Sequence, residues 1–264
     1  MLLVHGLGAS SHVFDPLLAL GPEGLRLISF DLPCSGRSGA YCPLAVRAVA
    51  AEAVALLDRL EVPSAVVAGH SFGGAVAMEL AARYPGRVTG LVVSSAPIGG
   101  VPAPVRRALS APASDRVMEV VGRFPTSRLF TRAYLRLIFG RPEAVTPAVV
   151  DGYVAAAAAK NFYPAMLEGL RDLAAYRIPV EALNAGAVPT AVLWGDRDRL
   201  ATPAQGEQVA RALRTPIEWL AGTGHCVPEE RPDKLADAIR RLAAPSKKHR
   251  MPRPKAGGTK RTRR

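Results

Sequence analysis

Short, continuously apolar segments alternate along this chain with longer segments whose apolar residues recur every three or four positions. The short runs predict buried β-strands at 1–4, 25–30, 65–68, 88–94, 190–193 and 217–220. The longer segments predict amphipathic helices at 44–60, 72–84, 204–213 and 232–242. Strands and helices that alternate in this way predict an α/β fold with a doubly wound, mostly parallel sheet.

Residues 98–186 break the alternation. Their apolar periodicity predicts helices at 105–121, 127–139, 149–159 and 163–174, without a convincing strand. We therefore expect a helical cap inserted after the strand at 88–94. The predicted domains are an α/β core at 1–97 and 187–245, the cap at 98–186 and a tail at 246–264.

The formal net charge of +12 is concentrated at one end of the sequence. Residues 247–264 contain nine Lys or Arg and no acidic residue, and removing these nine charges leaves +3 for residues 1–246. This tail has almost no apolar side chains, so it is expected to be disordered and to bind polyanions only weakly. The nearly balanced body predicts no dedicated nucleic-acid site.

Three cysteines, Cys34, Cys42 and Cys226, form no close pair of the metal-binding type. Their odd number argues against a disulfide framework, and neither a zinc site nor another metal site is predicted. The first residues lack the basic region of a signal peptide, and no apolar run approaches the ~18 residues of a membrane helix. These features predict a cytoplasmic protein without a transmembrane segment.

The strongest chemical signal is Gly69-His70-Ser71-Phe72-Gly73, which fits the pattern G-x-S-x-G. It lies where the strand at 65–68 turns directly into the helix at 72–84, the context of a nucleophile elbow. The turn is too tight for bulky side chains at 69 and 73, and it lifts the serine hydroxyl above the sheet at a helix N-terminus. Ser71 is therefore the predicted nucleophile.

A serine nucleophile needs a base that titrates near neutral pH, and His225 is the predicted one. It follows the strand at 217–220, where a doubly wound sheet places its site. The other histidines have other expected positions. His249 lies in the tail, His12 begins a surface helix, His70 points away from the nucleophile, and His5 packs in a loop.

Two aspartates after the strand at 190–193 can supply the carboxylate that orients the base. Asp198 is preferred because it lies further round the loop, whereas Asp196 more readily caps the turn.

Two backbone N–H groups are predicted to stabilise an oxyanion: that of Phe72, directly after the nucleophile, and that of Leu7 in the His-Gly turn.

These motifs carry a family resemblance. HGLGAS, DLPCSGRS, GHSFGG, WGDRDRL and GTGH occur in the order and at the spacings of the α/β-hydrolase superfamily, in its group of cap-containing serine hydrolases. The resemblance covers residues 1–245, and Ser71 distinguishes the chain from related dehalogenases and epoxide hydrolases, which use aspartate there. The family's chain order, Ser71, Asp198, His225, differs from those of chymotrypsin and subtilisin.

The resemblance implies that the cap folds over Ser71 and supplies most of a substrate pocket, with no cofactor. Its implied lining residues are Met118, Phe124, Phe130, Tyr134, Phe139, Phe162, Tyr163 and Met166. The expected activity is hydrolysis of a small apolar ester, thioester or lactone through an acyl-enzyme on Ser71. Carbon–carbon bond hydrolysis and acyl transfer use the same residues, and a non-catalytic ligand-binding protein is the alternative of another class.

Two features depart from the family pattern. The family usually has two further strands before the His-Gly turn, so we expect that the natural start lies upstream and that the segment 25–30 is an exposed edge through which copies associate. Cys34 stands where the family more often has glycine. Since cysteine tolerates a positive φ poorly, we expect the loop to take another path there. Cys226 is expected to be an inert buried thiol.

Overall fold

The computed structural model describes residues 1–21, 24–39, 44–97, 103–124, 126–177, 179–186 and 188–243. Six strands form one sheet in the order β2-β1-β3-β4-β5-β6, and every neighbouring pair is parallel. The strands are β1 (Leu2–Val4), β2 (Ile28–Ser29), β3 (Ala65–His70), β4 (Val88–Ser94), β5 (Thr190–Gly195) and β6 (Ile217–Leu220). The prediction of a doubly wound parallel sheet is confirmed.

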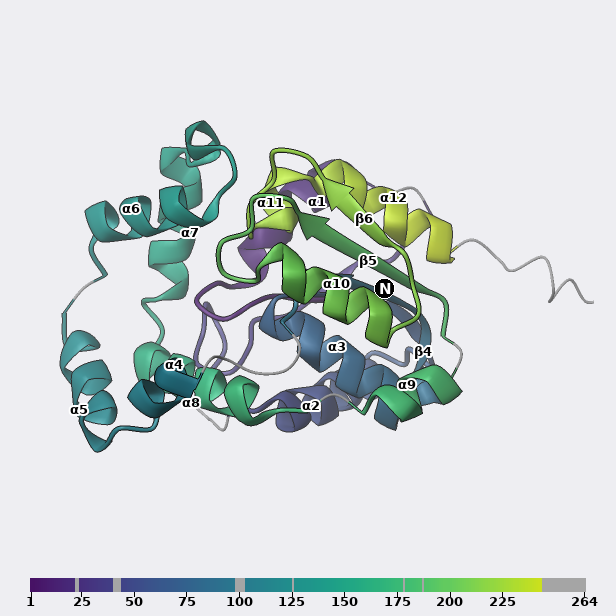
Figure 1. Cartoon of the computed structure of the whole chain (residues 1–264), viewed down its shortest axis with the longest axis horizontal. Coiled ribbons are helices and arrows are strands. Elements are labelled where there is room, and N and C mark those ends of the chain that lie inside the picture. The colour runs from purple at the N-terminus through teal and green to yellow at the C-terminus, as the bar shows by residue number, and fades with distance from the viewer. Residues whose placement is uncertain are drawn as a thin grey trace, which may run out of the picture.

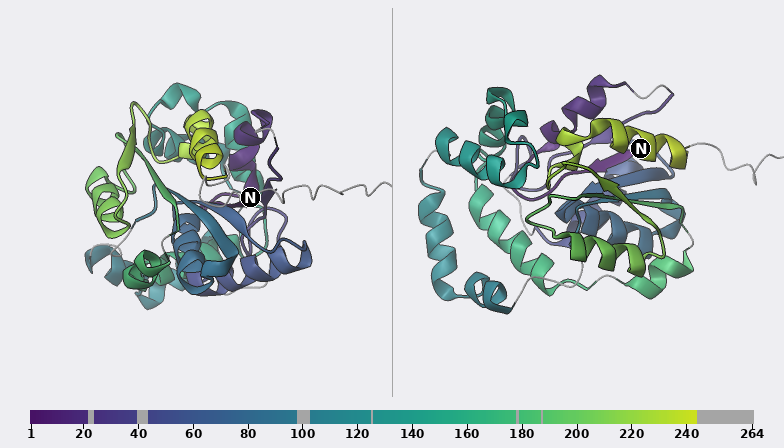
Figure 2. Two further views of the ribbon diagram at one scale, coloured as in Figure 1. Left: turned by 90° about the vertical axis from the view of Figure 1, so that its right-hand side faces the viewer. Right: turned by 45° about the horizontal axis from the view of Figure 1, so that its top comes forward.

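Alternate side chains of each strand enter two separate cores. Leu2 and Val4 of β1 belong to one core, whereas Leu3 belongs to the other. Helices α2 (Val46–Arg59), α3 (Phe72–Arg83) and α10 (Pro203–Ala212) cover the first face. Helices α1 (Asp15–Ala19) and α12 (Pro232–Ala243) cover the second, and Figures 1 and 2 show the sheet between these two layers. Apolar burial on both faces explains why the strands read as continuous apolar runs.

The connection from β4 to β5 is a long helical segment, as the sequence predicts. Its helices are α4 (Ala103–Leu109), α5 (Pro112–Val121), α6 (Arg128–Ile138), α7 (Pro147–Ala156), α8 (Phe162–Ala175) and α9 (Val180–Ala185). The segment has a small core of its own, which includes Leu135, Ile138 and Val150. In Figure 1, α5, α6 and α7 lie at the end of the molecule toward which the arrows of β5 and β6 point, whereas α9 lies at the opposite end.

The remaining elements are short. They are the 3-10 turns η1 (Ser11–Phe14), η2 (Pro85–Arg87) and η3 (Pro142–Ala144), and the single-turn helix α11 (Val227–Glu230). No helix within the described ranges is long and apolar enough to cross a membrane. The predicted tail at 246–264 lies outside the described residues.

Two predicted elements differ from the structure, and one observed helix between β4 and β5 was not predicted. The strand predicted at 25–30 is reduced to β2, which pairs only with β1 at one edge of the sheet. The single helix predicted at 105–121 is divided into α4 and α5, because Pro112 cannot continue a helix and instead begins the next one. The helix α9 was not predicted, because at six residues it is too short to show a clear apolar period.

Cys34 also departs from expectation. Its φ is +58°, so the loop keeps the left-handed conformation that a glycine would favour, and the prediction of another path is wrong. Cys34 is disulfide-bonded, which the cysteine count did not predict. Cys226 is free and buried, as expected.

Candidate active site

Ser71 occupies the sharp turn between β3 and α3. Its φ of +54° and ψ of −120° are rare for a residue with a side chain, and they direct the hydroxyl away from the sheet. A Cβ at Gly69 would clash with the backbone of Gly73, and one at Gly73 would clash with the carbonyl of Val4. The two glycines therefore permit the close approach that forms the elbow.

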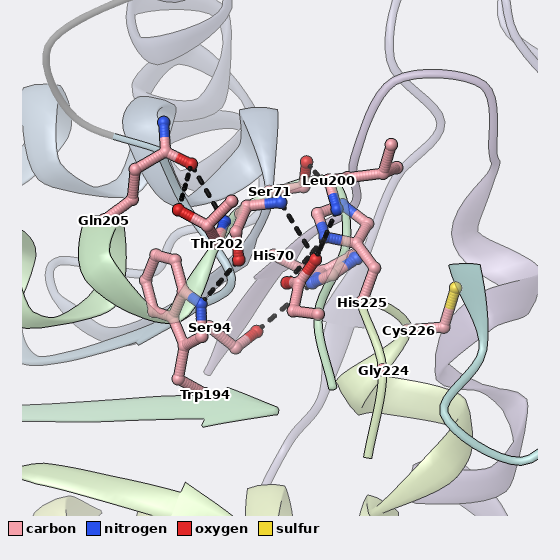
Figure 3. A network of polar contacts seen from close by, with 12 residues as sticks. His70, Ser71, Ser94, Trp194, Leu200, Thr202, Gln205, Gly224, His225 and Cys226 are labelled. Carbon is pink, nitrogen blue, oxygen red and sulfur yellow. Dashed lines mark hydrogen bonds and ion pairs between the residues drawn. The ribbon is translucent and has the colours of Figure 1, made fainter. Parts of the chain in front are cut away.

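The structure brings the three predicted polar side chains together in one hydrogen-bonded series. Nε2 of His225 lies 3.0 Å from Oγ of Ser71, and Nδ1 of His225 lies 2.9 Å from Oδ2 of Asp198 (Figure 3). Asp198 is 3% exposed and His225 is 7% exposed. Since the carboxylate accepts from Nδ1–H, the Nε2 that faces Ser71 can accept the hydroxyl proton.

The loop after β5 places Asp198, and not Asp196, beside His225. Oδ1 of Asp198 accepts hydrogen bonds from the N–H groups of Leu200 and Ala201, at 2.9 and 2.8 Å. Nε1–H of the buried Trp194 donates to the carbonyl of Ala201, which stabilises the same loop. Asp196 is exposed and makes no contact with His225, so Asp198 is the residue that the structure pairs with the imidazole.

Of the two predicted oxyanion donors, Leu7 lines a small cavity and Phe72 is the first residue of α3. Among the described residues, neither Leu7 N–H nor Phe72 N–H has a hydrogen-bond acceptor. The cavity has an empty volume of about 220 Å³ and is lined by Leu7, Phe162 and Met166, among others. His5, whose Nε2 accepts from Leu32 N–H at 2.9 Å, fixes the base of this turn as the sequence predicts.

The predicted lining aromatics occupy different environments. Phe162 is buried at the cavity, and the hydroxyl of Tyr163 is hydrogen-bonded to Thr126. Phe124 and Phe130 are 67% and 79% exposed, so neither is enclosed in a pocket. Desolvation of its hydroxyl, followed by the charges of Cys226 and Asp198, raises the pKa of Tyr134 to about 12, although half of the residue is exposed.

Two histidines differ from their predicted positions. The ring of His70 is not remote from the site: its centroid lies 5.0 Å from that of His225, and its Nδ1 lies 3.4 Å from Oγ of Ser94. Burial, followed by the proximity of His225, lowers the pKa of His70 well below its usual value, so this ring is neutral. His12 lies in η1 and packs edge-on against Tyr153, instead of beginning a surface helix.

Glu230, which sequence reasoning missed, joins the His225 loop to the end of α6. Its two carboxylate oxygens accept from the N–H groups of Gly224 and Gly140, each at 2.9 Å, and the side chain is buried. His225 N–H donates to the carbonyl of Ile138 at 2.8 Å across the same contact. A Cβ at Gly140 or Gly224 would collide with the facing backbone. The backbone carrying His225 is therefore fixed against the helical segment.

A second buried group of titratable side chains lies behind His225. The hydroxyl of Tyr153 donates to Oε2 of Glu229 at 2.7 Å and lies 3.6 Å from Sγ of Cys226. Burial raises the pKa of the Cys226 thiol well above its usual value, so the thiol is protonated near neutral pH. Burial also raises the pKa of Glu229 to about 8.

Glu229→Gln should change how stability depends on pH. Between pH 5 and 8 the unfolded wild-type chain has released the Glu229 proton while the folded chain retains it, so wild-type stability falls as pH rises. The variant lacks this loss, and its stability relative to wild type should increase by about 3 kcal/mol across this window. Urea unfolding at both pH values measures the difference, with the exposed Glu143→Gln as control. Parallel wild-type and Glu229→Gln profiles would contradict it.

Comparison with known proteins agrees with the fold and the motifs. The sequence matches the Alpha/beta hydrolase family over residues 1–238. It is 30% identical over 253 residues to the magnesium-chelatase 30 kDa subunit of Rhodobacter capsulatus, covering 90% of this chain and 84% of that protein. It is 31% identical over 216 residues to a pimeloyl-(acyl-carrier protein) methyl ester esterase of Neisseria meningitidis, covering 80% of this chain and 66% of that protein.

Among solved structures, a thermophilic esterase from Thermogutta terrifontis superposes with a TM-score of 0.74 at 24% identity, covering 91% of this chain and 87% of that one. The chain therefore belongs to the alpha/beta hydrolase family.

Proposed function

We propose that this protein is a serine hydrolase that cleaves a small apolar ester, thioester or lactone through an acyl-enzyme on Ser71. The observation that carries the proposal is the series Asp198–His225–Ser71, with adjoining distances of 2.9 and 3.0 Å. His225 takes the hydroxyl proton as Oγ of Ser71 attacks the carbonyl carbon, and Asp198 stabilises the imidazolium that forms. His225 then returns the proton to the departing alcohol or thiol.

The tetrahedral oxyanion is stabilised by the N–H groups of Leu7 and Phe72, which are free to donate to it. A water molecule, deprotonated by His225, then releases the acid from Ser71. The helical segment between β4 and β5 acts as the cap, and the buried Phe162 provides an apolar wall for the acyl group.

A panel of p-nitrophenyl esters of increasing acyl length tests this function, with Ser71→Ala as the blank. We expect kcat/KM to be highest for short chains and to fall as the acyl group outgrows the cavity. No hydrolysis of any ester by folded wild-type protein would reject the proposal and would favour the non-catalytic binding protein. Carbon–carbon cleavage and acyl transfer remain alternatives, distinguished by testing diketones and by adding alcohol acceptors.

The choice between the two aspartates gives a direct prediction. Asp198→Asn should lower kcat by about 10⁴-fold, because the amide stabilises the wrong imidazole tautomer without changing the geometry. Asp196→Asn should change kcat by less than about threefold, since Asp196 is exposed and lies outside the hydrogen-bonded series. Steady-state kinetics of both variants on the same ester measures the contrast. Equal losses would remove the assigned role of Asp198.

A further inference from the structure

Exposed apolar side chains are concentrated on two neighbouring helices of the segment between β4 and β5. Eight of the twelve large apolar side chains exposed in the described part of the chain lie there, with exposures from 40% to 79%. They are Val117, Val120, Val121, Phe124, Leu129, Phe130, Tyr134 and Leu137, and we call them the α5–α6 surface. On each helix the exposed apolar side chains lie within a few residues of one another, and a gathered apolar surface marks an interaction site more often than a solvated face.

The spacing of these residues shows that the exposure is patterned. Val117, Val120 and Val121 are spaced at i, i+3 and i+4 and form one stripe along α5, and Phe124 follows in the turn after its end. On α6, Leu135 and Ile138 face the protein, so a second apolar face points outward. Both helices lie at the end of the molecule remote from α9 in Figure 1, and the right-hand view of Figure 2 agrees.

Arginines accompany the apolar stripes. Arg128, Arg132 and Arg136 are exposed at intervals of four residues and form a line along α6 beside Leu129. Arg128 is paired with Asp151, but neither Arg132 nor Arg136 makes an ion pair with a described residue. Residues 112–139 contain five arginines against Asp115 and Glu119, and Asp115 is already paired with Arg171 of α8. The surface is therefore both apolar and cationic.

We propose that the α5–α6 surface docks on anionic lipid membranes. A bilayer interface provides an apolar phase for the exposed side chains and negative headgroups for the arginines, the combination that interfacial amphipathic helices use. A second copy of this chain fits less well, because a symmetric contact would bring like-charged arginine lines together.

Co-sedimentation with vesicles tests this proposal independently of hydrolysis. The full-length protein should bind phosphatidylcholine vesicles that contain phosphatidylglycerol, and bind vesicles of phosphatidylcholine alone more weakly. Leu129→Ser/Leu137→Ser should lower the partition coefficient at least about tenfold. Arg132→Gln/Arg136→Gln should lower it by about tenfold, and only for vesicles with phosphatidylglycerol. These side chains are exposed, so both variants should melt at the wild-type temperature.

The matched control is Leu18→Ser/Leu20→Ser, which removes two leucines exposed to 42% and 47% on another part of the molecule. Its binding should equal that of wild type. Three results would overturn the proposal: no binding by wild type; unchanged binding by Leu129→Ser/Leu137→Ser, which would assign binding to the basic residues 247–264; or a wild-type oligomer that this variant converts to a monomer without any effect of vesicles.

Discussion

Ser71→Ala should lower kcat/KM for a short p-nitrophenyl ester by at least about 10⁴-fold, because the variant has no hydroxyl to form the acyl-enzyme. The residual rate would come from substrate binding and from the N–H groups of Leu7 and Phe72. Stability should change little, since alanine replaces serine at the same φ of +54° without adding volume. Steady-state kinetics and thermal melting measure the two effects.

Ser95→Ala is a closely matched control for this experiment. Ser95 is buried, also has a positive φ, of +49°, and its Oγ has no hydrogen-bond partner within the described ranges. Its loss should change kcat/KM by less than about threefold, because Ser95 lies outside the hydrogen-bonded series. Adding His225→Ala to Ser71→Ala should cause almost no further loss, since residues that act as one unit are strongly non-additive. Additive losses would indicate independent roles.

Glu230→Ala should lower the free energy of unfolding by about 3 kcal/mol, because it leaves two buried N–H groups without an acceptor. One of them belongs to Gly224, directly before His225, so the imidazole should also lose its fixed position. We expect kcat to fall by about tenfold or more with a smaller change in KM. Glu230→Gln should lie between wild type and Glu230→Ala, because one of its side-chain atoms can accept but the other would face a donor.

Urea unfolding and steady-state kinetics on the three proteins test this prediction. The control is Glu143→Ala, which removes an exposed carboxylate from η3 near the same contact and should leave stability and kcat unchanged. The account of Glu230 would fail if Glu230→Ala were as stable and as active as wild type. A loss of stability with unchanged kcat would show that the residue is structural and does not position His225.

The local pattern of apolar and polar residues predicted most of the fold, because strands buried on two faces are continuously apolar and helices that cover them are apolar at every third or fourth residue. The strand at 88–94 and the helix at 72–84 are examples: the first is continuously apolar and the second ends at Pro85. The strand predicted at 25–30 is too long, since only Ile28 and Ser29 pair with another strand. The break between α4 and α5 was available from Pro112 but was outweighed by the apolar periodicity around it.

The polar series was predictable because Ser71, Asp198 and His225 each follow a recognisable strand at the same edge of the sheet. Contacts between distant segments were not predictable in this way. Glu230 pairs with Gly140, ninety residues earlier, and nothing in the local sequence distinguishes it from the acidic residues of an exposed first turn. The proximity of His70 to His225 likewise depends on how two loops pack. Glu230 is identified instead by the buried N–H groups of Gly140 and Gly224, which both need an acceptor.

Labelling with a fluorophosphonate tests the central claim most directly, because this reagent reacts covalently with a serine activated by a neighbouring base. Intact-mass and peptide analysis of the wild-type protein should give one adduct, on Ser71, and none on Ser71→Ala. The rate of labelling should fall steeply in His225→Ala, in which the hydroxyl has no base at 3.0 Å. Folded wild-type protein that stays unlabelled, or that carries the adduct on another residue, would contradict the mechanism.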